Sequence, residues 1–296
     1  MKLKCAVFAL LLSAVGFAQT QLGFTTYTTT WANNTRTYGV FIPQKGMSAN
    51  PPMMFYLHGS FSGPATPWNN VSEWIAIANE YKVIVVWPLS TYVPRVNASY
   101  WAANDLAFTF TSNPDDIGWL CSLIPQLVTQ FNANPNAVFL TGMSSGGLMT
   151  QRVGMTCPQY LAAIAPISGQ IYMEQMTDSW RPPAFINAPL SVLEIHGDAD
   201  TDLEYCGQTP HLEWSASFMI LPSVDQDMAF WAQMDGLPPP SESLCTNGVP
   251  TPGVTGYTIS GNGVTLQFID NVGAGHVWPT WAYQSIWQFF AANQRY

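Results

Sequence analysis

A serine flanked by glycines separates an apolar segment from a helix-like segment in this 296-residue chain. Gly142, Ser144 and Gly146 have the G-x-S-x-G spacing of a nucleophile elbow, a sharp turn that exposes the serine hydroxyl. Glycines are needed because the backbone is strained there and side chains two positions away would collide. The apolar run 137–140 is typical of a buried parallel strand, and residues 147–153 begin a helix. We therefore expect Ser144 to be a nucleophile.

The residue after this serine brings a second chemical group. The amide of Ser145 lies at the N-terminus of the expected helix. Unpaired N–H groups and the helix dipole stabilise a negatively charged oxygen at such a position. We expect this amide to contribute to an oxyanion hole.

Candidate acids and a candidate base follow two later strand-like segments. The acids are Asp198, Asp200 and Asp202 in HGDADTD, and the base is His276 in GAGHVWP. A serine hydroxyl needs a histidine to remove its proton and an acid to orient that histidine. The order serine, acid, histidine is that of α/β-hydrolase enzymes. The alternating aspartates could also bind calcium, but the glycine and terminal glutamate of an EF-hand loop are missing, so we expect no metal and no cofactor.

Two other histidines have a structural interpretation. His58 and His196 each precede a glycine at the end of an apolar segment. We expect their imidazoles to pack and to form hydrogen bonds that hold loops.

The elements that must position these residues alternate between strand and helix. Expected strands are 53–57, 83–87, 137–140, 161–167, 190–195 and 264–269, and expected helices are 68–81, 115–131, 147–153, 226–234 and 281–293. Hairpins are expected at 25–43 and 257–269, an irregular stretch at 88–113 and a cysteine-bearing loop at 238–252. The pattern predicts one α/β domain over residues 19–296. Its doubly wound, mostly parallel sheet has about eight strands, helices on both faces, and the site at the carboxyl ends of the strands.

Residues 1–18 have the features of a secretory signal peptide. They combine two lysines with an apolar centre at 5–15 and small residues at Gly16 and Ala18. Cleavage leaves 7 basic against 18 acidic residues, a formal charge of −11, which disfavours nucleic acid and anionic membranes as partners. No later segment approaches the ~20 apolar residues of a membrane span. We expect a secreted, extracellular protein; its oligomeric state is open.

Cleavage would also leave four cysteines, an even number that suits an oxidising compartment. Chain order favours Cys121 with Cys157 and Cys206 with Cys245, one of three possible connectivities. Three sequons, at Asn33, Asn70 and Asn97, are glycosylation candidates if the source is a eukaryote.

Six segments together resemble secreted serine esterases of carbohydrate esterase family 1, which contains feruloyl esterases, acetyl xylan esterases and polyhydroxybutyrate depolymerases. They are YLHGS at 56–60, PDDIGWL at 114–120, TGMSSGGLM at 141–149, AAIAPISG at 162–169, EIHGDAD at 194–200 and GAGHVWP at 273–279. The resemblance covers most of the expected mature chain. It implies the α/β-hydrolase fold, Asp200 as the acid, His276 as the base, and the Ser60 amide as the second oxyanion donor. Many relatives have cysteine where this chain has Ser60, so one of their disulfides is absent or rearranged here.

The resemblance implies an esterase acting on a polysaccharide-linked or polymeric ester, most specifically feruloyl esters on arabinoxylan. An acetyl xylan esterase and a polyester depolymerase are alternatives. An inactive carbohydrate-binding protein is a remoter one, because binding alone needs neither the serine, acid and histidine nor the glycine turns. Four aromatic residues are candidates to stack on an acyl ring or a sugar: Tyr100, Trp101, Tyr205 and Trp278.

Overall fold

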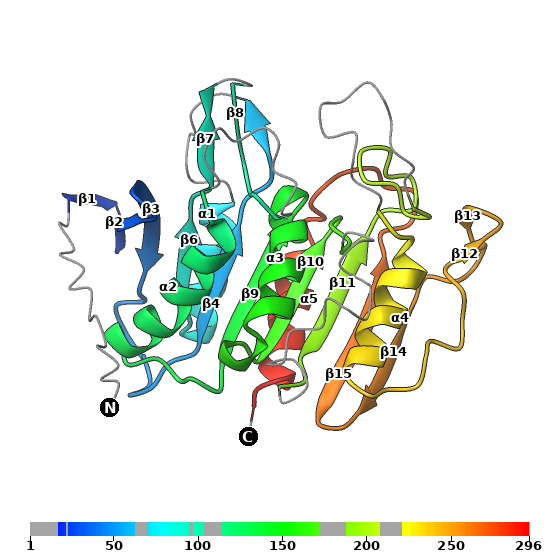
Figure 1. Cartoon of the computed structure of the whole chain (residues 1–296). Coiled ribbons are helices and arrows are strands. Elements are labelled where there is room, and N and C mark those ends of the chain that lie inside the picture. Colours follow the sequence, from blue (N-terminus) through cyan, green and yellow to red (C-terminus); the bar gives the residue numbers. More distant parts are fainter. Residues whose placement is uncertain are drawn as a thin grey trace, which may run out of the picture.

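The computed structural model describes residues 17–21, 23–62, 70–94, 97–103, 114–171, 188–207 and 221–295. Within these residues a ten-stranded sheet forms the centre of the molecule (Figure 1). In spatial order its strands are β1 (Phe17–Gln21), β2 (Phe24–Trp31), β3 (Asn34–Phe41), β6 (Ile84–Pro88), β4 (Met53–Leu57), β9 (Val138–Met143), β10 (Ala163–Ile167), β11 (Ser191–His196), β15 (Val264–Asp270) and β14 (Gly256–Gly261).

The middle of the sheet is parallel, and both edges are antiparallel. Strands β6, β4, β9, β10, β11 and β15 run parallel, while β1, β2 and β3 extend one edge and β14 pairs with β15 at the other. The chain passes from β4 outward to β6 and then returns to β9 on the other side of β4. Ligands bind in open α/β sheets where connections diverge in this way, at the carboxyl ends of the strands.

Helices cover both faces of the sheet. The residues of α2 (Asp116–Gln130), α3 (Ser145–Thr156) and α4 (Val224–Met234) pack into one core cluster, on the side that faces the viewer in Figure 1. Those of α1 (Val71–Tyr81) and α5 (Ala282–Ala292) pack into the other. Strand β4 serves both clusters: Met53 and Phe55 point into the first, and Met54 and Tyr56 into the second. Successive side chains of a strand point to opposite faces, so a strand buried on both sides is apolar throughout.

The predicted α/β-hydrolase fold is confirmed, with two more strands than the expected eight. The stretch expected to be irregular contains β7 (Thr91–Val93) and β8 (Ala98–Tyr100), which form a small separate sheet with β5 (Phe61–Ser62). The expected cysteine-bearing loop contains a short hairpin of β12 (Cys245–Thr246) and β13 (Val249–Pro250). These strands have two or three residues each, too short for a recognisable alternating pattern.

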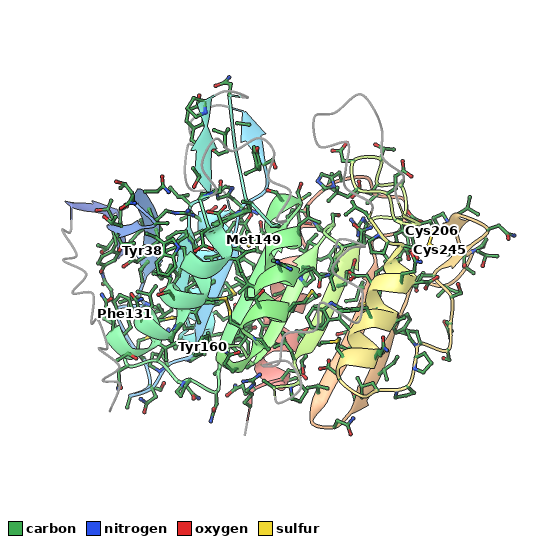
Figure 2. The ribbon with its side chains drawn as sticks, in the orientation of Figure 1. Tyr38, Phe131, Met149, Tyr160, Cys206 and Cys245 are labelled. Atoms are coloured by element: carbon green, nitrogen blue, oxygen red, sulfur yellow. A yellow bond between two sulfur atoms is a disulfide. The ribbon has the colours of Figure 1, made fainter. Side chains whose placement is uncertain are left out.

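The structure forms two disulfides, in the pairing that chain order favoured. Cys121 bonds to Cys157, which joins α2 to the end of α3, with an S–S distance of 2.11 Å. Cys206 bonds to Cys245 at 2.13 Å, and this bond lies beside the short hairpin (Figure 2). Residues 1–16 of the expected signal peptide lie outside the described residues, and β1 spans its expected cleavage point. Within the described part of the chain, no helix is both long and apolar enough to cross a bilayer.

Candidate active site

Ser144 occupies a strained turn between β9 and α3. Its φ of 56° and ψ of −125° lie outside the regions that L-residues favour, which costs about 1–3 kcal/mol. The surrounding backbone holds this conformation: the Ser144 amide donates to the Ile167 carbonyl at 3.0 Å, and its own carbonyl accepts from Leu148 at 2.9 Å. This is the geometry expected of a nucleophile elbow.

The two glycines of the elbow are required by the close approach of β4. A Cβ atom on Gly142 would lie 2.5 Å from the Gly146 carbonyl oxygen and 2.7 Å from that of Leu57. A Cβ atom on Gly146 would lie 2.5 Å from the His58 carbonyl oxygen. Real Cβ contacts are not this short, so a side chain at either position would push the serine turn away from β4.

Asp200 and His276 meet beside this turn. His276 Nδ1 lies 2.7 Å from Asp200 Oδ2, while Asp200 Oδ1 accepts from the amides of Asp202 at 2.9 Å and Leu203 at 3.0 Å. The carboxylate is acceptor-only, so Nδ1 of His276 is the donor and Nε2 remains for a second partner. His276 and Ser144 line the same cleft.

The other two candidate aspartates have different surroundings. The Asp202 side chain is exposed, and Asp198 accepts a hydrogen bond from the Gly273 amide, which ties it to the histidine loop. Burial alone would raise the pKa of the Asp200 carboxyl. Hydrogen bonds from His196, His276 and the Leu203 amide outweigh burial and hold that pKa well below its ordinary value. Asp200 is therefore ionised and oriented toward His276.

The loop after β4 lies against the serine turn. A Cβ atom on Gly59 would lie 3.4 Å from the Ser144 Cβ and from the Met143 carbonyl oxygen. Ser60 follows Gly59 and lines the cleft with Ser144. The loop after β4 and the serine turn therefore form adjoining parts of the same cleft.

His58 fixes this loop from beneath. Its Nδ1 lies 2.7 Å from the Gly59 carbonyl oxygen, and its Nε2 accepts from the Ser90 amide at 3.1 Å. These partners require the proton on Nδ1. Burial lowers the pKa of His58 to about 4, so the imidazole is neutral and supports the loop as the sequence predicted.

A buried ion pair supports the same loop from the other side. Trp101 donates its indole N–H to the His58 carbonyl oxygen at 2.9 Å. The adjacent amide, of Ala102, donates to Asp116 at 2.8 Å, and Asp116 pairs with Arg36 at 2.5 Å. Arg36 and Asp116 are both buried. Asp116, in the PDDIGWL segment, thus supports the loop indirectly, because it holds the stretch of backbone that carries Trp101.

The cleft above Ser144 has a volume of about 890 Å³. Its described lining combines residues of the serine and histidine turns with the beginning of α1: Phe24, Tyr56, Gly59, Ser60, Asn70, Val71, Ser72, Glu73, Ile75, Met143, Ser144, His276 and Trp278. Phe24 is not a residue that the sequence marked, because nothing in its local pattern distinguishes it from a core residue, and Met143 stood in the elbow motif without a role of its own.

Of the four aromatic residues predicted to contact substrate, Trp278 lies in the described lining of this cleft. Its ring packs against Tyr56, Trp74 and Tyr283 at centroid distances of 5.5, 6.0 and 5.2 Å. Such a cluster gives the cleft a rigid aromatic wall.

The other three aromatic residues have structural surroundings instead. Trp101 is buried and bonded to the His58 carbonyl, and Tyr205 is buried between His196 and Phe268. Tyr100 belongs to β8 of the small sheet. None of the three is among the described residues that line the cleft. Aromatic residues pack in protein cores as readily as they bind substrates, and the sequence alone does not distinguish a core residue from a substrate-binding one.

The three sequons differ in their surroundings. Asn33 lies in the exposed turn between β2 and β3, and Asn97 is exposed before β8. Asn70 lines the cleft and donates from Nδ2 to the Tyr56 hydroxyl at 2.9 Å. Its amide nitrogen is thus already engaged inside the cleft.

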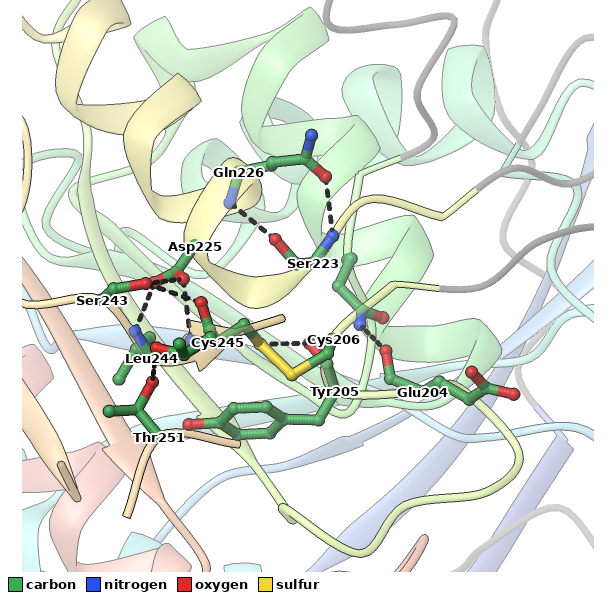
Figure 3. The surroundings of a disulfide bond; sticks show 12 residues. Glu204, Tyr205, Cys206, Ser223, Asp225, Gln226, Ser243, Leu244, Cys245 and Thr251 are labelled. Atoms are coloured by element: carbon green, nitrogen blue, oxygen red, sulfur yellow. Dashed lines mark hydrogen bonds between the residues drawn. A yellow bond between two sulfur atoms is a disulfide. The ribbon is translucent and has the colours of Figure 1, made fainter. Parts of the chain in front are cut away.

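The Cys206–Cys245 disulfide anchors the loop that carries Asp200. Figure 3 shows Asp225, at the start of α4, accepting hydrogen bonds around this disulfide. Its donors are the amides of Leu244 at 2.7 Å and Cys245 at 2.8 Å and the hydroxyl of Ser243 at 2.8 Å. The segment from Asp200 to Cys206, called the acid loop below, is therefore held to the hairpin and to α4.

Among the described residues no cluster of histidine, cysteine or acidic side chains is arranged to hold a metal ion.

Comparison with known proteins identifies ester hydrolases. The chain is 25% identical over 251 residues to acetylxylan esterase A of Talaromyces purpureogenus, a match that covers 81% of this chain and 63% of that protein. It is 24% identical over 255 residues to feruloyl esterase B of Talaromyces stipitatus, covering 81% and 68%. Poly(3-hydroxyalkanoate) depolymerase C of Paucimonas lemoignei is 25% identical over 262 residues, covering 80% and 60%. No protein-family model matches.

Solved structures agree on the fold. An acetyl xylan esterase from Aspergillus awamori superposes with a TM-score of 0.59 at 16% identity, covering 86% of this chain and 94% of that one. The relatives carry the names of the three kinds of esterase in the group that the motifs resemble, so the predicted resemblance is confirmed. The chain spans 60–68% of the length of these three curated relatives.

Proposed function

We propose that this protein is a serine esterase that hydrolyses ester bonds on plant cell-wall polysaccharide, with feruloyl esters on arabinoxylan as its substrate. One observation carries the reaction class: the strained Ser144 lines the same cleft as His276, whose Nδ1 is bonded to Asp200 at 2.7 Å. The names of the relatives support the class of substrate.

The reaction proceeds in two steps. His276 Nε2 removes the proton from Ser144 Oγ as that oxygen attacks the ester carbonyl carbon, and Asp200 stabilises the imidazolium that forms. The amides of Ser60 and Ser145 donate to the tetrahedral oxyanion. His276 then returns the proton to the departing alcohol oxygen, and the C–O bond breaks. Water, activated by His276, releases the acid and restores Ser144.

The aromatic acyl group is favoured by the wall of the cleft. Trp278 is held by three other aromatic rings, and Phe24 and Met143 line the same cleft. A planar cinnamoyl ring stacks well on an indole face. An acetyl group would leave most of this apolar surface in contact with water.

A panel of three substrates tests the proposal: methyl ferulate, acetylated xylan and a short hydroxybutyrate oligomer, each with wild-type protein and with Ser144→Ala. Wild-type protein should prefer methyl ferulate, and Ser144→Ala should be inactive on all three. Preference for acetylated xylan or the oligomer would retain the mechanism and overturn the substrate.

A matched pair of tryptophan variants tests the acyl wall. Trp278→Ala should raise KM for methyl ferulate by roughly 10-fold or more and should affect an acetyl ester much less, because only the aromatic acyl group stacks. Trp281→Ala is the control, since Trp281 is 40% exposed and lies outside the described lining. Equal losses on both esters would contradict a role in acyl selection.

Secretion is part of the proposal. Two disulfides support folding in an oxidising compartment. Recovery of the protein from the culture medium with an N-terminus near Gln19 would establish it. Retention inside the cell with residues 1–18 attached would refute it.

A further inference from the structure

A second histidine lies behind the acid of the proposed triad. The His196 side chain is fully buried at the end of β11. Its Nε2 lies 2.8 Å from the Leu203 carbonyl oxygen and 3.4 Å from Asp200 Oδ2, the oxygen that also accepts from His276. Both neighbours of Nε2 are acceptors, so Nε2 carries a proton. His196 thus contacts Asp200 and the backbone of the loop that carries it.

The other nitrogen of this imidazole faces two buried carboxyl groups. His196 Nδ1 lies 3.5 Å from Glu194 Oε1, and neither side chain is exposed. Asp227, on α4, is also fully buried and acts on Glu194 electrostatically, while neither Glu194 oxygen has a hydrogen-bond partner among the described residues. Two adjacent buried carboxylates are unfavourable because neither is solvated and their charges repel.

These carboxyl groups connect to the helix that follows the nucleophile. Asp227 accepts from Gln151 Nε2 at 2.7 Å and from the Ile171 amide at 3.3 Å. Gln151 lies on α3 and is oriented by Trp231, whose indole donates to Gln151 Oε1 at 2.6 Å. Asp227 is therefore tied to α3, while Glu194 and His196 lie on β11, between Asp227 and the acid loop.

We propose that His196 is a positioning residue that holds Asp200 against His276, and that a protonated Glu194, facing Nδ1, keeps His196 in the Nε2–H tautomer. Through its contacts with Asp200 and the Leu203 carbonyl oxygen, His196 holds the acid loop to the end of β11. The proposal rests on the proposed function only in treating Asp200 as the catalytic acid.

The charge state of the carboxyl pair agrees with this assignment. Burial raises the pKa of Glu194 to about 8 and holds that of Asp227 well above its ordinary value. The pair therefore retains a proton near neutral pH. Other titratable groups that interact with the pair are His196 and, from neighbouring elements, Tyr205 and Tyr257.

Nitrogen NMR of ¹⁵N-histidine-labelled wild-type protein reads the tautomer directly. The chain has only four histidines. Near pH 7, His196 should carry its proton on Nε2 and none on Nδ1. His58 is an internal reference with the opposite tautomer, because its Nδ1 faces a carbonyl oxygen and its Nε2 accepts from an amide. Protons on both nitrogens of His196, or on Nδ1 alone, would overturn the proposal whether or not the protein is an esterase.

Three variants test positioning. Glu194→Gln keeps an N–H donor toward His196, so kcat should remain within about threefold of wild type, whereas Glu194→Met has similar bulk and no donor. Glu194→Met should lower kcat roughly 10–100-fold with KM unchanged, because it misplaces Asp200 without touching the substrate cleft. Asp235→Asn, on a buried aspartate that accepts from the Leu190 amide, is the control with wild-type kcat.

The rate of labelling by a fluorophosphonate should fall in parallel with kcat in Glu194→Met. That reagent reacts with an activated Ser144 and does not depend on recognition of the ester substrate. A folded Glu194→Met with wild-type kcat, or a Glu194→Gln as impaired as Glu194→Met, would refute positioning. If Glu194→Met does not fold, the tautomer measurement and Glu194→Gln still decide. Loss of all hydrolysis in wild-type protein would count against the proposed function, not against this network.

Discussion

His276 Nδ1 and Asp200 Oδ2 lie 2.7 Å apart, although 76 residues separate them in the chain. Asp200 follows β11, which pairs in parallel with β15, and His276 follows β15. The carboxyl ends of two parallel neighbours lie at the same edge of the sheet, so the two loops meet there. The sheet thus determines this contact and leaves only the loops to adjust it.

Replacing each candidate acid in turn should distinguish Asp200 from the aspartates beside it in the sequence. Asp200→Asn should lower kcat by roughly 10⁴-fold, as the corresponding change does in serine proteases, because an amide no longer fixes the histidine tautomer. Asp202→Asn should stay near wild type, since the Asp202 side chain is exposed. Steady-state kinetics on methyl ferulate measure both. The reverse order of losses would move the acid to Asp202.

The strained backbone at Ser144 predicts that the geometry of the nucleophile turn lowers the free energy of unfolding. Ser144→Ala and Ser144→Gly both remove the hydroxyl and should both abolish hydrolysis. Only glycine relaxes the φ of 56°, so Ser144→Gly should be more stable than Ser144→Ala by about 1 kcal/mol. Urea unfolding of the two variants isolates this backbone effect. An alanine variant as stable as the glycine variant would show that the turn is unstrained.

The buried acids predict a pH-dependent stability. Glu194 has an ordinary pKa of 4.5 that burial raises to about 8 in the folded protein. The folded state therefore binds more protons than the unfolded state between these values, and wild-type stability falls as pH rises through that range. Glu194→Gln removes this contribution, so its stability relative to wild type should increase from about pH 4.5 to about pH 8. Thermal unfolding across that range measures the difference.

Asp235 provides an independent comparison, because burial raises its pKa to about 7. Asp235→Asn should gain relative stability over a pH range that ends about one unit lower. A difference from wild type that does not change with pH, in both variants, would contradict the raised values.

The two disulfides should differ in their effect on activity. They close segments of similar length, 36 and 39 residues, so each should stabilise the fold by about 4 kcal/mol. Replacing Cys206 and Cys245 with serine should also lower kcat, because the loop that carries Asp200 loses its anchor. Replacing Cys121 and Cys157 should lower the unfolding temperature with kcat unchanged at 25 °C. Equal kcat in the two double variants would contradict the anchoring role.

Much of the fold could be predicted because the buried strands have a clear signature. Strands β4, β9 and β11 are short apolar runs, buried on both faces. The small sheet of β5, β7 and β8 could not be predicted in the same way. Its strands are two or three residues long, and their pairing depends on tertiary contacts.

Some residues of the site could be predicted from the sequence and others could not. Ser144 and His276 stand in turns whose glycines mark them, whereas Asp200 needed the family resemblance to separate it from two neighbouring aspartates. Trp101 and Trp278 looked equivalent in the sequence, yet one supports His58 and the other lines the cleft. Glu194 did carry a signal: it is the one charged residue in the apolar run from Leu190 to Ile195. A carboxyl group inside a buried strand needs polar neighbours, and these are His196 on the same strand and Asp227 on α4.

The most direct test of the central claim is covalent labelling by a fluorophosphonate, followed by identification of the modified peptide. An activated serine reacts through its oxygen, so we predict stoichiometric modification of Ser144 that disappears in Ser144→Ala and slows strongly in Asp200→Asn. Absence of labelling in folded wild-type protein, or labelling at another residue, would contradict the assignment of this cleft as a serine esterase site.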